Sequence, residues 1–247
     1  MITIKIGNCL EVLKTLPRDH FNTVVTSPPY YGLRDYGMAD QLGLEETPEE
    51  YVKNMVQVFR EVHRVLRDDG TLWLNLGDSY ARTGGDSSKT GRHWDNRENN
   101  PTTSHNRFAK DMGLKQKDLI GIPWRVAFAL QEDGWYLRQD IIWHKPNPMP
   151  ESVKDRCTKS HEYIFLLSKS PNYYFDYESI QEEASQNRWG GNTPINTENS
   201  KDKKNVFNGL TRERDMMPET KNKRSVWNTK YKDDEEERTH RQGMSKT

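Results

Sequence analysis

Residues 22–32 read Asn-Thr-Val-Val-Thr-Ser-Pro-Pro-Tyr-Tyr-Gly, and the character of the chain changes abruptly within them. The first half, residues 22–26, is a β-branched run that predicts a buried strand. The second half begins at Ser27 and continues with Pro28 and Pro29, which fix two φ angles and supply no backbone donors. The carbonyl groups in this half can only accept hydrogen bonds. The segment therefore predicts a buried strand that ends in a rigid loop rich in acceptors.

The sequence on both sides of this strand alternates between helix and strand patterns. Thr47, Pro48 and Glu50 are typical of a helix start, with a capping hydroxyl, a proline in the first turn and a carboxylate three residues after the cap. Apolar residues then repeat along one helix face as far as Leu66, and Asp69-Gly70 is expected to end the helix. Strands alternating with helices predict an α/β sheet. The other predicted elements are strands at 2–6, 71–76, 135–143 and 162–167 and helices at 10–16 and 123–131.

The composition is unusually polar for a chain of 247 residues, since apolar residues make up 32% and the formal net charge is zero. The apolar deficit lies in residues 81–118 and from 179 onward, which predicts one compact domain with a polar insertion and a polar tail. No apolar run is long enough for a membrane span, and residues 1–5 lack the layout of a signal peptide, so we expect no membrane partner. Cys9 and Cys157 are too few for a disulfide framework or a metal knuckle, so we expect no metal and a reducing, cytoplasmic setting.

Polar residues follow three of the predicted strands, where ligands of open α/β sheets bind. The loop after residue 26 offers the Ser27 hydroxyl, acceptor carbonyls and the flat ring of Tyr30. Such a group suits a planar ligand with an exocyclic amine, of which an extruded nucleobase is an example. A proline-rich turn at a strand end, with no ligand, is the alternative. The other two loops begin at Asn75 and His144.

Thr26-Ser27-Pro28-Pro29-Tyr30 resembles the catalytic motif of the amino-group DNA methyltransferases, in its Ser-Pro-Pro-Tyr form. Further blocks in the same order are similar to those of that family, and they cover residues 7–11, 65–78, 143–152, 161–165 and 224–227. The resemblance implies a Rossmann-like α/β fold that depends on S-adenosylmethionine. It covers residues 2–178 well and the remainder weakly.

The resemblance also implies a mechanism and a set of site residues. The exocyclic amine of an extruded base attacks the methyl group of S-adenosylmethionine, while Ser27 and the Pro28 carbonyl bind the amine and Tyr30 stacks on the base. Pro29 completes the catalytic motif. The Ser form of the motif usually accompanies N(4) of cytosine, and N(6) of adenine stays the alternative. Four residues match positions near the cofactor in relatives: Asn8, Cys9, Leu10 and Thr26.

The sequence departs from the family in one block. The order of motifs resembles the subgroup in which a Phe-x-Gly-x-Gly block follows toward the C-terminus and holds the methionine part of the cofactor. The glycine pairs at 84–85 and 190–191 lie in polar stretches without a preceding strand, so this block is missing and the fold is expected to be incomplete. Three interpretations stay open: an enzyme completed by a second chain, a truncated copy, or a DNA-binding protein that does not methylate.

The resemblance divides the chain into a catalytic core at 1–178, a target-recognition region at 179–227 and a charged tail at 228–247. Double-stranded DNA is the implied partner. Residues 201–232 hold ten Lys or Arg and four Asp or Glu, giving +6, and 233–237 then give −5. The basic stretch suits phosphate contacts, and a solvated disordered tail is the alternative.

Four further polar residues are candidates for the base pocket or for DNA contacts: Asp78, His144, Lys145 and Asn147. Each follows a predicted strand. Asp78 has an alternative as the cap of the next turn, and His144 has an alternative as a structural histidine.

Overall fold

The computed structural model describes residues 2–38, 40–81, 113–183 and 220–228. By its contacts the chain forms two compact units, one made of residues 1–174 with 225–247 and the other of 175–224. The described part of the second unit contains a short antiparallel pair, β5 (Glu182–Glu183) with β6 (Thr220–Lys221). Most of the predicted insertion, of the predicted tail and of the predicted recognition region lies outside the described residues.

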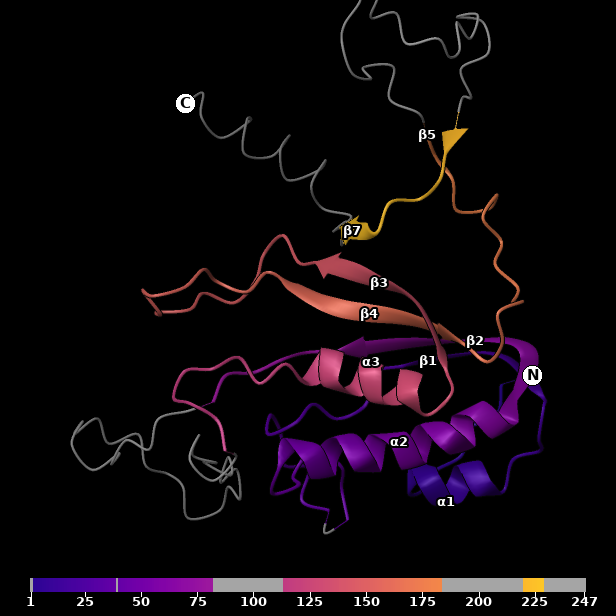
Figure 1. Ribbon diagram of the computed structural model, residues 1–247, viewed down its shortest axis with the longest axis horizontal. Helices are drawn as coiled ribbons and strands as arrows, with labels where there is room; N and C mark the ends of the chain where they lie inside the picture. The colour runs from indigo at the N-terminus through magenta and orange to yellow at the C-terminus, as the bar shows by residue number, and fades with distance from the viewer. Residues whose placement is uncertain (1, 39, 82–112, 184–219, 229–247) are drawn as a thin grey trace, which may run out of the picture. The chain divides into compact units, whose positions relative to one another are not determined.

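The first unit is built on a five-stranded sheet in the order β1-β2-β4-β3-β7 (Figure 1). The strands are β1 (Phe21–Thr26), β2 (Leu66–Leu76), β3 (Tyr136–His144), β4 (His161–Ser168) and β7 (Val226–Asn228). The β1–β2 and β3–β7 pairs are parallel, whereas β4 runs antiparallel to both of its neighbours. The sheet is therefore mixed, and the predicted α/β class is confirmed.

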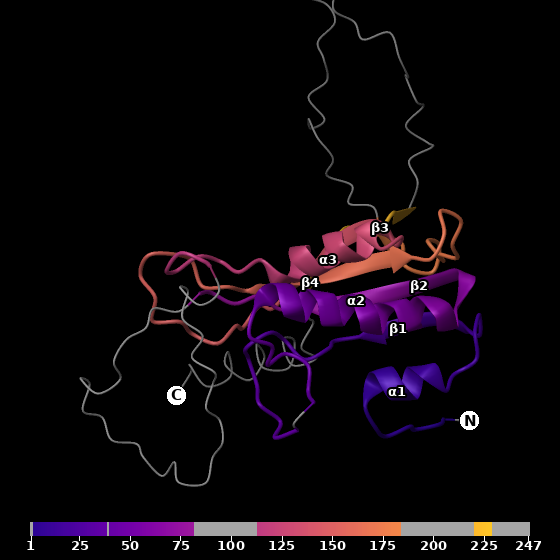
Figure 2. The same cartoon turned by 60° about the horizontal axis from the view of Figure 1, so that its bottom comes forward.

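Three helices of the described chain lie on one side of this sheet, as the two views show (Figures 1 and 2). They are α1 (Cys9–Lys14), α2 (Pro48–Val65) and α3 (Ile122–Glu132). The predicted start of α2 is confirmed, because the Thr47 hydroxyl accepts a hydrogen bond from the backbone N–H of Glu50. Its buried face carries Tyr51, Met55 and Phe59 toward the sheet.

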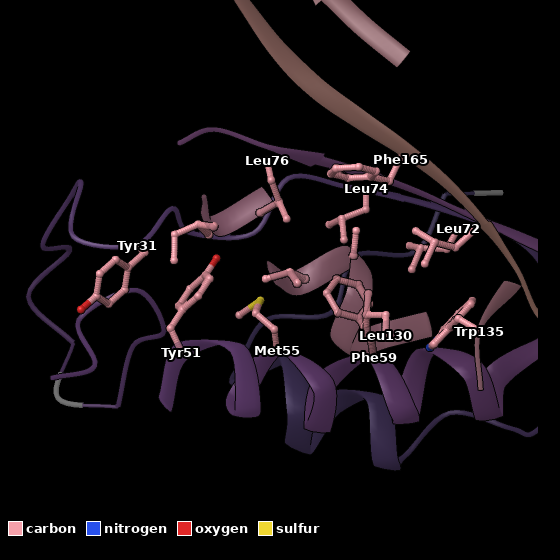
Figure 3. Close-up of a cluster of buried hydrophobic side chains, with 14 of the residues drawn as sticks. Tyr31, Tyr51, Met55, Phe59, Leu72, Leu74, Leu76, Leu130, Trp135 and Phe165 are labelled. Carbon is pink, nitrogen blue, oxygen red and sulfur yellow. The ribbon is translucent and has the colours of Figure 1, made fainter. Parts of the chain in front are cut away.

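The core fills the space between α2, α3 and the strands (Figure 3). Figure 3 shows the aromatic and aliphatic side chains of α2 facing leucines of β2 and Phe165 of β4. The fully buried residues include Tyr51, Leu72, Leu74 and Leu76. Since β2 is an interior strand of the sheet and its leucines are buried on this face, it fixes where the polar residues at its carboxyl end emerge.

The burial predicted for residues 22–26 is wrong: they form β1, but this strand lies at the edge of the sheet and none of its residues is buried, with Val25 77% exposed. Two predictions about the elements themselves are also wrong. Residues 2–6 alternate in sequence, but they form no strand in the described chain, and the side chains of Ile2, Ile4 and Ile6 are 81–94% exposed. Alternating apolar residues can give a strand one apolar face, but a strand also needs a neighbouring strand that pairs with its backbone N–H and C=O groups.

The second wrong prediction concerns the end of α2. The helix ends at Val65, and Leu66 is already extended with ψ 144°. Gly70 lies inside β2, where a Cβ atom would come within 2.9 Å of the Arg67 carbonyl oxygen and 3.2 Å of the Asn22 carbonyl oxygen. This glycine therefore allows a close backbone approach between β1 and β2 and does not end a helix.

Candidate active site

Sheet topology brings three distant segments together at the carboxyl end of β1. This strand is parallel to β2, with Thr26 opposite Leu74, so the loops that follow both strands leave the same edge. Because β4 is antiparallel to β2, its first residues lie beside the last residues of β2, with Leu76 opposite Tyr163. Ser27, Asn75 and Glu162 consequently meet although they come from three separate parts of the chain.

A hydrogen-bond network joins the Ser-Pro-Pro-Tyr loop to these strands. The Tyr30 hydroxyl lies 2.7 Å from Asn75 Oδ1 and 2.9 Å from Glu162 Oε2. Ser27 Oγ lies 3.3 Å from both the Tyr30 hydroxyl and Asn75 Oδ1, and it can donate its one proton to either. The Asn75 amide donates to the Tyr163 carbonyl at 3.2 Å, which fixes Oδ1 as the atom that faces the loop.

The direction of these bonds determines what Ser27 offers to a ligand. Its hydroxyl proton is used within the protein, toward Tyr30 or Asn75. The lone pairs of Ser27 Oγ are then available to accept hydrogen bonds from outside. Ser27 is also exposed, whereas Tyr30 is half-buried. This serine is therefore presented as a hydrogen-bond acceptor.

The charges around Tyr30 keep its phenol neutral. Burial raises the pKa of Tyr30 to about 12, and the Glu162 carboxylate adds to the rise, against an opposing hydrogen bond from Ser27. Glu162 itself has a pKa below its ordinary value: its burial opposes ionisation, but hydrogen bonds from Lys145 and Tyr30 outweigh that effect. Lys145 reaches Glu162 because its backbone N–H bonds to the Ser160 carbonyl, at 2.7 Å, beside the start of β4. Lys145, Glu162 and Tyr30 thus form a chain of hydrogen bonds that holds the tyrosine ring in place.

The two proline carbonyls have different environments. The Pro29 carbonyl accepts a hydrogen bond of 2.8 Å from the hydroxyl of Tyr51, whose side chain is fully buried on α2. No described residue donates to the Pro28 carbonyl. Pro29 is therefore the structural anchor of the loop, and Pro28 keeps an acceptor beside that of Ser27.

Gly77 makes room for the Tyr30 ring. A Cβ atom at position 77 would lie 2.5 Å from Cε2 and 2.7 Å from Cδ2 of Tyr30, far closer than carbon atoms approach one another. The residue after β2 must therefore lack a side chain if the tyrosine is to keep its place.

A cavity of about 650 Å³ lies next to the same loop. Asn8, Cys9 and Leu10, which the sequence suggested for the cofactor, line it together with Pro29. The Asn8 side chain caps α1 by accepting from the Leu10 N–H at 3.0 Å and donates to Asp40 Oδ2 at 2.9 Å. Burial raises the pKa of the Cys9 thiol. Thr26, the fourth suggested residue, is at the end of β1 and not in the cavity wall.

The remaining predicted site residues are dispersed. Asp78 Oδ1 accepts from the backbone N–H groups of Gly121 and Ile122, at 3.0 and 3.1 Å, so it caps the start of α3, and it also accepts from the neighbouring Ser79 N–H at 2.9 Å. His144 Nδ1 lies 2.9 Å from Asn228 Oδ1 at the end of β3. Asn147 is exposed on the loop after β3, away from the network.

Sequence reasoning missed the partners of Tyr30. It named Asn75 only as the start of a loop and Glu162 only as the start of a strand, and it gave Gly77 no role. Glu162 is 132 positions away from Tyr30, so no local spacing relates them. The available signal was that Glu162 is an acidic residue at the first positions of an otherwise apolar strand.

The described residues contain no group of His, Cys, Asp or Glu side chains that could hold a metal ion. Among the described helices, none combines the length and the apolar character needed to cross a bilayer.

Comparisons with known proteins identify the family. Residues 21–246 match the N6/N4 family described as DNA methylase. The Type II methyltransferase M.SmaI of Serratia marcescens is 56% identical over 182 residues, which are 74% of this chain and 61% of that protein. M.Cfr9I of Citrobacter freundii is 53% identical over 177 residues, which are 72% of this chain and 57% of that protein.

The chain thus spans about three fifths of the length of these relatives. Among solved structures, the cytosine-N4-specific PvuII DNA methyltransferase aligns with a TM-score of 0.48 and 18% identity, over 71% of this chain and 51% of that one. The match of the family over most of the sequence shows that this chain belongs to the N6/N4 DNA methylases.

Proposed function

We propose that the chain is the catalytic part of a site-specific DNA methyltransferase that moves a methyl group from S-adenosylmethionine to the exocyclic amine of an extruded base. The observation that carries the proposal is the orientation of Ser27. Its proton is used inside the protein, and the Pro28 carbonyl has no donor among the described residues, so in this proposal the two oxygens accept the two amine protons. Such acceptors draw the amine nitrogen toward tetrahedral geometry and free its lone pair.

Tyr30 supports the base in this proposal. Its ring stacks on the extruded base, and its hydroxyl is held by Asn75 and Glu162 so that the plane of the ring is fixed in advance. Because the ring is already fixed in the free protein, binding of the base costs less conformational entropy.

The cavity beside Asn8, Cys9 and Leu10 suits the adenosine part of S-adenosylmethionine. Its lining combines apolar side chains with the polar groups of Asn8 and Asp40, as small-ligand sites commonly do. When bound, S-adenosylmethionine supplies an activated methyl group. Because Pro29 lies in the cavity wall and Ser27 is two residues away, both ligands would meet at this loop. The proposal also includes a second chain that completes the cofactor site.

The proposed base is cytosine, methylated at N(4), because Ser27 occupies the first position of the motif. Adenine N(6) is the alternative on the same scaffold. Incubation with DNA and methyl-labelled S-adenosylmethionine, followed by digestion and nucleoside analysis, distinguishes N(4)-methylcytosine from N(6)-methyladenine.

The central test is methyl transfer by the full chain, alone and with the completing chain. Ser27→Ala is expected to reduce kcat on the order of 10²-fold, since one preorganised polar group is lost. Tyr30→Phe should reduce activity less than Tyr30→Ala, because the ring stays while its anchor is lost. Tyr174→Phe removes the hydroxyl of a tyrosine that is 71% exposed and serves as the matched control. Absence of methyl transfer under both conditions, with salt-dependent DNA binding retained, would leave a non-enzymatic DNA-binding protein.

A further inference from the structure

A cavity of about 910 Å³ opens beyond the end of β2, where Asp78 follows Gly77. None of its lining residues belongs to the Ser-Pro-Pro-Tyr loop, but Lys159 in its wall interacts electrostatically with Glu162, a hydrogen-bond partner of the Tyr30 hydroxyl, which links the cavity to the network around the proposed base-stacking position. Its walls are highly charged, with three acidic and three basic side chains: Asp78, Glu151, Asp155, Lys117, Arg156 and Lys159. The ion pairs and hydrogen bonds of these six side chains show which of the charged groups have a direct partner.

Most of these charges have partners. Lys117 Nζ pairs with Asp155 Oδ2 at 2.6 Å. Arg156 pairs with Glu151, and its guanidinium also lies 4.0 Å above the ring of Tyr80.

Asp78 is satisfied in a different way, by the backbone N–H groups of Gly121 and Ile122 at the start of α3. The positive end of this helix favours a carboxylate there. None of these three carboxylates forms an ion pair with Lys159.

Lys159 is the exception. It is half-buried in the cavity wall, and no described residue forms a hydrogen bond or an ion pair with its ammonium group. The carboxylates of Asp78, Glu162 and Glu151 act on it only at longer range. Burial lowers its pKa because the ammonium group loses part of its hydration, although Asp78, Glu162 and Glu151 oppose the shift. An anion entering the cavity would compensate for the lost hydration.

We propose that this cavity binds a phosphodiester group of the DNA strand, with Lys159 as its cationic ligand, next to the nucleotide that is extruded toward Ser27 and Tyr30. This inference rests on the proposed function. Extrusion rotates a nucleotide about its backbone, so the adjacent phosphate necessarily accompanies the base to the catalytic loop. A single half-buried ammonium group near the Glu162–Tyr30 network fixes the position of that phosphate, while sequence readout occurs elsewhere.

The test is the salt dependence of DNA binding by the full chain. Fluorescence anisotropy with a labelled mixed-sequence duplex gives the binding constant at several KCl concentrations. Removal of one phosphate contact should reduce the slope of log K against log salt by about 0.9 in magnitude. We expect this change for Lys159→Met, and we expect Lys159→Arg to restore the slope. Unchanged thermal stability of Lys159→Met would confirm that its effect is on binding.

Lys154→Met is the matched control, because Lys154 is an exposed lysine on the same loop. An unchanged slope for Lys159→Met, or an equal reduction for Lys154→Met, would overturn the proposal. Weaker S-adenosylmethionine binding by calorimetry with unchanged DNA binding would also overturn it, because the anion would then be the carboxylate of that molecule. If the wild-type chain showed no salt-dependent DNA binding, the proposed function would fail together with this inference.

Discussion

A methyl group at position 77 is expected to displace the catalytic tyrosine. Gly77 has no backbone strain that would penalise alanine, so the effect of Gly77→Ala is steric. The new Cβ would lie 2.5 Å from Tyr30 Cε2, whereas carbon atoms in contact are about 3.5 Å apart, so the ring must move by about 1 Å. That movement lengthens the distances of 2.7 and 2.9 Å from the Tyr30 hydroxyl to Asn75 Oδ1 and Glu162 Oε2, to either of which its one proton can be donated.

The effect of Gly77→Ala on the free energy of unfolding has two opposing contributions. Overpacking of this kind costs about 1–3 kcal/mol of stability. The lower backbone entropy of alanine in the unfolded chain returns about 0.4–1 kcal/mol. We therefore expect a net loss near 1 kcal/mol in the free energy of unfolding. A 1 Å displacement of the ring should reduce methyl transfer on the order of 10²-fold.

Urea unfolding of four proteins measures the effect: wild type, Gly77→Ala, Tyr30→Ala and the double variant. Without the ring, the added methyl group meets nothing at 2.5 Å, so Gly77→Ala should be neutral or slightly stabilising in the Tyr30→Ala background. The reasoning is refuted if Gly77→Ala lowers stability equally in both backgrounds. It is also refuted if the single variant keeps wild-type stability and activity.

Three further predictions concern the supports of the site and of α2. Glu162→Gln should make the free energy of unfolding depend less on pH in the acid range. The lowered pKa of Glu162 contributes stability that is present above about pH 4.5 and is lost as the pH falls through the pKa of the folded protein. Unfolding measured at several pH values checks this. A slope equal to that of wild type would contradict it, and Lys145→Met should act in the same direction. Tyr51→Phe leaves the Pro29 carbonyl without its donor and should cost about 1–3 kcal/mol in urea unfolding; a change below the measurement error would exclude that hydrogen bond. Thr47→Ala removes a helix cap and should cost about 1 kcal/mol, with Thr47→Ser as the conservative control that retains most of the stability.

Local patterns predicted the elements that depend on local physics. The β-branched run before Ser27 forms β1, and the Thr47 cap begins α2 where the sequence placed it. Both outcomes follow from interactions within a few residues, namely strand propensity and a hydroxyl that bonds to a nearby N–H. The same reasoning failed for Gly70, because the space around it is limited by the Arg67 carbonyl of its own strand and by the Asn22 carbonyl of the neighbouring strand.

Chemistry at strand ends was predictable only in part. The sequence located the acceptors of Ser27 and Pro28, since prolines and a small hydroxyl act within one loop. It gave Asp78 two possible roles, and the structure shows the cap of α3 because Gly121 and Ile122 are brought to its carboxylate. More than forty positions separate Asp78 from Gly121 and Ile122, so no periodic pattern in the sequence indicates this contact.

The sequence by itself determined the α/β class and the family to which the chain belongs, because short consecutive motifs carry both. The catalytic role of the Ser-Pro-Pro-Tyr loop stays a prediction. Only the tertiary structure decided which residues hold that loop. Antiparallel β4 places Glu162 beside the end of β2, and close packing leaves room at Gly77 for a ring but not for a side chain. It also left Lys159 as a half-buried cation without an ion pair among the described residues. Pairing between distant segments determines such neighbours, and their identity cannot be obtained from spacing along the chain.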